Sequence, residues 1–328
     1  MIYIVGFAVT FLAVVFFQYK LAPSREPITE KLENGRVFRP KQLLLVFAFL
    51  LCFLPLFLIS ALREGIGTDY FYTYTPRFLE ILEGERTYYE IGFYYLNRLI
   101  GLFTSNPQWV FVVTSFFFCT FVALSFYRNC EDLSLCVIIF LVTGEYFISL
   151  NNLRQALASS LVLFGYKYLS EKRWIVFAII TAIATSLHKS MVVFFAVLAI
   201  CWLLQYVSLK NMLIFMAAAV AVFYAAIKVF PEVLTAVMPA RLAYYIENSI
   251  FNAATIGNLR TVVNIVIFAF LLFTRFYSEN TELDYFVIVQ FIAVALCFFD
   301  GAVPAAYSLL RLFTFWQLLS LPKAITLY

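Results

Sequence analysis

Apolar runs long enough to cross a lipid bilayer recur along this chain from its beginning to its end. Hydrophobic residues fill 64% of the 328 positions and charged residues only 13%, and the mean hydropathy is +0.91. A helix of roughly 20 apolar residues spans about 30 Å of hydrocarbon, and it satisfies its own backbone hydrogen bonds there. The sequence therefore predicts an all-α polytopic membrane protein.

About eleven membrane spans are expected from the positions of these runs. No internal repeat or change of composition separates them, so we expect a single integral membrane domain over residues 1–328. The first run has neither a basic start nor a cleavage motif, which favours a retained anchor over a signal peptide. The expected spans are 1–19, 42–62, 108–127, 133–150, 152–169, 174–188, 190–207, 211–230, 259–277, 285–300 and 302–321.

Lysine and arginine residues predict the orientation of the spans. The segment 20–41 is rich in both and is expected in the cytoplasm by the positive-inside rule. Alternating from there places the N-terminus outside, together with two long outward loops at about 63–107 and 231–258. Residues 88–103 are apolar and aromatic with few charges, which suits a helix lying at the membrane interface.

Two unusual polar residues are expected at the same outward face. Arg154, within LNNLRQALASS, begins the fifth span, and its planar guanidinium suits a phosphate. His188, within SLHKS, is the only histidine and ends the sixth span, where it could take a proton or hold an anion. An arginine that snorkels to the interface and a hydrogen-bonded turn histidine are the simpler alternatives.

Other charges and aromatic residues belong to the same predicted face. Asp69 lies among aromatic residues, including Tyr70 and Tyr72, and Glu90 repeats this pattern; a carboxylate among aromatic rings suits a sugar. The interfacial aromatic belt of membrane proteins would explain single tyrosines equally well. Arg241, Arg260, Arg311 and Asp300 add further candidates at the outward face, and Arg311 could instead pair with Asp300 or Glu145.

Together these residues predict a cavity at the outer leaflet that holds a lipid-linked sugar pyrophosphate. Cations would bind the pyrophosphate, aromatic residues the sugar and the bilayer flank the lipid. The single histidine excludes a multi-histidine metal centre, and the six cysteines lack the spacing of a disulfide framework or a thiolate metal site.

With these residues in view, the chain resembles the EpsG family of Wzy-type bacterial polysaccharide polymerases. The resemblance rests on four motifs in order, with about eleven spans around them: G-T-D-Y (67–70), E-x-G-F (90–93), N-N-L-R-Q-A-L-A (151–158) and H-K-S (188–190).

The resemblance implies a GT-C-like, O-antigen polymerase-type bundle that works without metal or cofactor. The implied reaction joins undecaprenyl-pyrophosphate-linked repeat units at the periplasmic face of the bacterial inner membrane, for O-antigen, capsule or exopolysaccharide. Arg154 would hold the pyrophosphate, and His188 would be a second phosphate ligand or the base, with Asp69 the other base candidate. The implied partners are lipid-linked oligosaccharide, membrane lipid, and the chain-length regulator and flippase of the same pathway, but no nucleic acid.

Three alternatives remain. A ligase would move the finished glycan to a different acceptor, whereas only a polymerase needs two copies of the same lipid-linked substrate. A lipid-linked oligosaccharide flippase should show pseudo-repeats and charges that reach both faces. A structural or sensor membrane protein gives no reason for the pairing of Arg154 with His188.

Overall fold

The computed structural model describes residues 1–22, 29–32, 35–38, 40–85, 87–229, 257–299 and 306–327. The chain divides into two compact units, 1–192 and 193–328, each of which is described by itself. In the described residues the units are helical apart from one antiparallel hairpin in unit 1, which pairs Thr29 with Phe38. The prediction of an all-α protein is confirmed, while that of one membrane domain over 1–328 stays a prediction.

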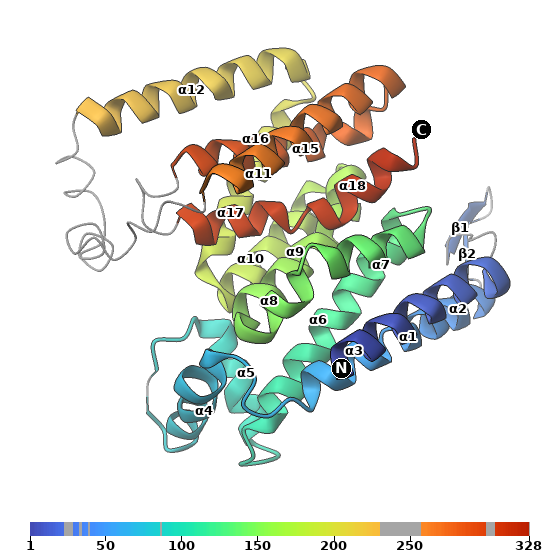
Figure 1. Cartoon of the computed structure of the whole chain (residues 1–328), viewed down its shortest axis with the longest axis vertical. Coiled ribbons are helices and arrows are strands. Elements are labelled where there is room, and N and C mark those ends of the chain that lie inside the picture. The colour runs from blue at the N-terminus through green and yellow to red at the C-terminus, as the bar shows by residue number, and fades with distance from the viewer. Residues whose placement is uncertain are drawn as a thin grey trace. The chain divides into compact units, whose positions relative to one another are not determined.

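Unit 1 is built around the long helix α6, which contacts α9, α3 and α2 (Figure 1). Helix α9 also packs against α10, and α1 packs against α3 and α7. The elements of unit 1 are α1 (Ile2–Phe16), β1 (Thr29–Leu32), β2 (Gly35–Phe38), α2 (Pro40–Cys52), α3 (Leu54–Ala61), α4 (Thr75–Leu82), α5 (Ile91–Gly101), α6 (Gln108–Asn129), α7 (Leu133–Val142), α8 (Glu145–Asn151), α9 (Leu153–Ser170) and α10 (Trp174–Leu187). Single π-helical turns follow α1 at Phe17–Leu21 and precede α4 at Tyr70–Tyr74, and a 3₁₀ turn follows α10 at Lys189–Val192.

Two of the expected spans are bent helix pairs. Helices α2 and α3 meet at 48°, where Pro55 in the first turn of α3 cannot donate to the preceding turn. Helices α7 and α8 meet at 55° around Gly144, whose φ of 75° is left-handed and suits glycine. After this second bend, α8 ends directly before the first turn of α9, which contains Arg154.

Unit 2 packs α15 and α17 against α16, and α11 and α12 also contact α16. Three buried amides link its helices, because Gln290 donates to Asn264 Oδ1 (3.0 Å) and Gln317 donates to both Asn264 Oδ1 and Gln290 Oε1 (3.1 Å each). The elements of unit 2 are α11 (Val193–Leu203), α12 (Leu209–Val229), α15 (Gly257–Ser278), α16 (Asp284–Phe298), α17 (Ala306–Thr314) and α18 (Gln317–Ile325).

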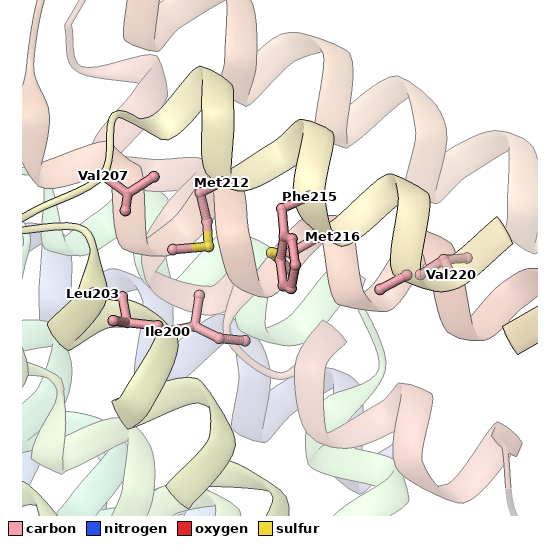
Figure 2. Close-up of a pocket in the computed structure, with 8 residues that line it drawn as sticks. Ile200, Leu203, Val207, Met212, Phe215, Met216 and Val220 are labelled. Carbon is pink, nitrogen blue, oxygen red and sulfur yellow. The ribbon is translucent and has the colours of Figure 1, made fainter. Parts of the chain in front are cut away.

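A pocket of about 540 Å³ lies in unit 2 between α11 and α12 (Figure 2). Only apolar side chains line it: Ile200, Leu203, Val207, Met212, Phe215, Met216, Ala219 and Val220. A pocket without polar groups cannot perform acid–base or phosphate chemistry.

The described helices agree with a multi-pass membrane protein. Four are long and apolar enough to cross a membrane, or up to six if each bent pair is one span, and three shorter apolar helices accompany them. The four are Ile2–Leu21, Gln108–Asn129, Leu259–Ser278 and Thr281–Phe298. The count of about eleven spans and the GT-C-like bundle stay predictions.

Candidate functional site

The four sequence motifs meet at one end of unit 1, where α6 begins and α10 ends and where α4 and α5 lie (Figure 1). Glu90 is the N-cap of α5, Arg154 is in the first turn of α9, and His188 is the C-cap of α10. The fold thus brings together Glu90 and His188, which are 98 positions apart in the sequence.

Glu90 is the centre of the site. Its Oε2 forms an ion pair with Arg154 Nη1, and its Oε1 lies 3.7 Å from His188 Nδ1. The backbone N–H of Lys189 also donates to Glu90 Oε1, at 3.3 Å. The side chains of Glu90, His188 and Arg154 are only 12%, 17% and 18% exposed, so water screens these interactions poorly. One carboxylate therefore links the predicted phosphate ligand to the predicted base.

Aromatic rings hold the Arg154 guanidinium in place. Its carbon lies 4.7 Å from the centre of the Tyr89 ring and 5.9 Å from that of Tyr88, which are cation–π distances. The Tyr74 side chain also interacts electrostatically with Arg154. Tyr74 and Tyr89 belong to a buried hydrophobic cluster with Phe93, so the side chains next to the arginine are themselves fixed by packing.

His188 has an imidazole without a hydrogen-bond partner. In the described part of the chain, neither Nδ1 nor Nε2 is hydrogen-bonded, although both atoms are buried. Burial lowers the pKa of His188 below its usual value; Glu90 opposes this shift, and Arg154 and Lys189 add to it. The imidazole is therefore neutral at neutral pH and able to accept a proton.

Asp69 is tied to the beginning of α9 by Asn151. The backbone N–H of Asp69 donates to Asn151 Oδ1 at 3.1 Å, and the Thr68 hydroxyl donates to the same oxygen at 3.3 Å. Gly67 has a φ of 90°, and a Cβ there would lie 2.9 Å from Asn151 Oδ1. Burial raises the pKa of Asp69, while Thr73 and Arg154 oppose the rise. The glycine of the G-T-D-Y motif thus lets the loop approach the α8–α9 junction.

Gly92 allows α5 to lie directly on the end of α10. A Cβ at this position would be 2.2 Å from Ser186 Oγ and 2.8 Å from the Ser186 backbone oxygen, closer than real atoms approach. The glycine of the E-x-G-F motif therefore sets the distance between the helix that carries Glu90 and the helix that carries His188.

Within the described part of the chain, the other predicted site residues make contacts with neither Glu90 nor His188 that the structure shows. Tyr70 is buried, donates to Gln108 Oε1 (2.9 Å) and stacks on Phe111, whereas Tyr72 is 82% exposed. In unit 2, the Arg260 guanidinium stacks on Tyr307 at 4.2 Å, and Arg311 lies in the last turn of α17. Arg241, Asp300 and most of the outward loop 231–258 lie outside the described residues.

Sequence reasoning did not single out Arg63, a second arginine at this end of unit 1. Arg63 is only 2% exposed, donates to the Ser60 backbone oxygen at 2.6 Å and lies 4.9 Å from the Phe111 ring centre. Burial lowers the pKa of Arg63 to about 10. The available signal was its position, because it is the first cation after the apolar run 42–62.

Among the described residues, no group of three or more histidine, cysteine, aspartate or glutamate side chains is placed to hold a metal ion. The observed groups are instead a cation for an anion, a neutral imidazole for a proton, and two carboxylates. This set suits transfer of a group from an anionic leaving group to a hydroxyl.

Comparison with known proteins agrees with the four motifs. The EpsG family matches the chain over residues 46–328, which includes every motif and most of both units. Searches of curated proteins and of solved structures found no significant match. Because the family covers most of its length, the chain belongs to the EpsG family.

Proposed function

We propose that this protein is a polysaccharide polymerase that joins lipid-pyrophosphate-linked oligosaccharide repeat units at the extracytoplasmic face of the bacterial cytoplasmic membrane. Membership of the EpsG family supports a polymerase-type function. The observation that carries the proposal is the arrangement of Arg154, Glu90 and His188, in which one carboxylate lies between a fixed cation and an imidazole that forms no hydrogen bond among the described residues.

Arg154 binds the pyrophosphate of the donor. Its planar guanidinium offers parallel N–H groups to two phosphate oxygens. As the bond to the sugar breaks, negative charge grows on the departing pyrophosphate, and a cation already aimed at that charge lowers the barrier. The rings of Tyr88 and Tyr89 hold the guanidinium in position.

His188 or Asp69 removes the proton from the acceptor. The acceptor hydroxyl oxygen forms a bond to the anomeric carbon of the donor sugar, while the bond from that carbon to the phosphate oxygen breaks. The electron pair of the broken bond leaves with the lipid pyrophosphate, and the hydroxyl proton moves to the base. With His188 as the base, the rate falls as the pH drops through its pKa, which burial places below the usual histidine value.

Residues outside this group have supporting roles in the proposal. Tyr72, which is 82% exposed, offers a ring for the face of a sugar. The roles of Arg241, Arg260 and Arg311 as phosphate ligands stay predictions from the sequence.

Supplying purified lipid-linked repeat unit to the membrane-reconstituted protein and resolving the products by length tests the proposal. We expect wild type to make a polymer ladder, and Arg154→Ala and His188→Ala to reduce its rate by about 100-fold or more, as the loss of a charge-stabilising or acid–base group does. Arg173→Ala is the matched control, because it removes an exposed cation from the turn between α9 and α10, beyond the opposite end of α9.

Each other outcome points to a different answer. Full activity in both variants would overturn the proposed site. A single transfer to a different acceptor, without a ladder, would identify a ligase. Movement of the substrate across the membrane without any new glycosidic bond would identify a flippase.

A further inference from the structure

We propose that Glu90 holds the phosphate position on Arg154 in the free protein, and that an arriving substrate phosphate displaces this carboxylate toward His188. Glu90 is then a positioning residue that couples donor binding to activation of the base. The inference rests on the proposed function, since it assigns His188 as the base, and its experiments can fail independently of that function.

The first step concerns which anion occupies the Arg154 guanidinium. Glu90 Oε2 already pairs with Arg154 Nη1, and both side chains are at least four-fifths buried. A buried arginine without a counter-ion is strongly destabilising, so the free protein needs this carboxylate. A phosphate that binds the same guanidinium edge replaces one anion by another and leaves the arginine neutralised throughout.

The second step concerns where the displaced carboxylate goes. Its other oxygen, Oε1, already faces His188 Nδ1 at 3.7 Å and accepts from the Lys189 backbone N–H at 3.3 Å. Glu90 is the N-cap of α5 with an extended ψ of 146°, so its side chain lies outside the helix. A small rotation would therefore shorten the contact with Nδ1, while Gly92 keeps α5 in place against Ser186.

The third step concerns the imidazole. The charged groups that face His188 are Glu90 on α5, Arg154 on α9 and its own neighbour Lys189. In the free protein, Arg154 and Lys189 disfavour the protonated imidazole. The Glu90 carboxylate that would stabilise it is also paired with Arg154. Once a phosphate neutralises Arg154 and Glu90 turns to Nδ1, both changes raise the pKa of His188. His188 is therefore a stronger base when a donor is bound than when the site is empty, so an acceptor is deprotonated mainly when a donor is present.

The first experiment measures binding of inorganic pyrophosphate to the full-length protein in lipid nanodiscs. Glu90→Gln removes the competing charge but keeps the size of the side chain. In wild type, pyrophosphate binds only to the minor fraction of molecules in which Glu90 has left Arg154, whereas in the variant Arg154 is free of this charge in every molecule. We therefore expect pyrophosphate to bind the variant about 10- to 100-fold more tightly. Glu171→Gln is the matched control, because Glu171 pairs with Lys167 and Arg173 at the other end of α9, and it should leave the affinity unchanged.

The same variant should polymerise more slowly although it binds the anion more tightly. Unchanged or weaker pyrophosphate binding by a folded Glu90→Gln protein would overturn the inference. If only Arg154→Ala lost pyrophosphate binding, the phosphate role of Arg154 would still be supported. The proposed function and the displacement of Glu90 can therefore fail separately.

The second experiment uses the wild-type protein and so does not depend on any variant folding. His188 is the only histidine, and one imidazole resonance in a magnetic resonance spectrum reports its pKa. We expect saturating pyrophosphate to raise this pKa by about one unit or more, and by clearly less in Glu90→Gln. An unchanged or lower value in wild type, or an equal rise in the variant, would overturn the transfer of Glu90 to His188.

Discussion

At the residue scale, the site depends on two glycines and one shared carboxylate. Gly67 and Gly92 each lie where a side chain would collide with a residue of, or next to, another motif, Asn151 and Ser186 respectively. Their absence of a Cβ is what lets the loop of Asp69 and the helix of Glu90 reach Arg154 and His188. Glycine in these motifs is thus explained by close approach and not by flexibility.

Gly92→Ala should lower polymerase activity by about tenfold or more, because an ångström-scale displacement of a catalytic group has effects of this order. The added methyl would meet the Ser186 backbone, which cannot rotate away, and should also cost about 1–3 kcal/mol of stability. Activity and thermal unfolding of the purified protein measure the two effects.

Gly101→Ala is the control for this change, since it lies at the other end of α5. Its Cβ would meet only the flexible Leu82 side chain. A Gly92→Ala protein as active as Gly101→Ala would show that the spacing of α5 and α10 does not matter for catalysis.

At the element scale, hydrogen bonds between polar side chains fix how neighbouring helices are aligned. Apolar contacts alone would allow several alignments. In unit 2, α15, α16 and α18 share the amides of Asn264, Gln290 and Gln317, which are all buried. Lipid gives no hydrophobic force between helices, so hydrogen bonds of this kind help to select one packing. In unit 1, the bent pairs α2–α3 and α7–α8 place polar helix ends beside the site.

Gln290→Leu should destabilise unit 2 by about 0.5–2 kcal/mol, because it leaves Asn264 and Gln317 without a shared partner. The expected result is a lower midpoint of thermal unfolding in detergent. Gln205→Leu makes the same chemical change at an exposed position in the turn after α11 and should leave the midpoint unaltered. Equal midpoints for the two variants would exclude a stabilising role for the amide cluster.

At the scale of the whole molecule, the proposed function requires the site to face away from the cytoplasm. The charge distribution predicts this orientation, with residues 20–41 and the α9–α10 turn inside. The same orientation predicts which surface residues a reagent outside the cell can reach.

In a variant without native cysteines, a membrane-impermeant maleimide applied to intact cells should label Tyr72→Cys. It should label Arg173→Cys only after the membrane is permeabilised. Tyr72 is 82% exposed and the Arg173 side chain 52%, so accessibility within the protein does not limit either reaction. Labelling of Arg173→Cys but not Tyr72→Cys in intact cells would reverse the topology and contradict an outward site.

The sequence by itself determined which segments are helical, and it indicated a membrane protein with Arg154 and His188 in one site. Helices account for most of the described residues of each expected span, because apolar length and composition are local properties of the chain. The described part of the last span, 302–321, divides into α17 and α18, just as the spans 42–62 and 133–150 each divide into two helices.

Only the tertiary structure decided which side chains are partners. Glu90 was predicted to contact sugar, and that role stays a prediction; the fold pairs it with Arg154, 64 positions away, and with His188. Neither the burial of Arg63 nor the collisions at Gly67 and Gly92 can be inferred from local sequence. The physical reason is that ion pairs and close approaches depend on how distant helices pack, whereas helix formation depends on neighbours along the chain.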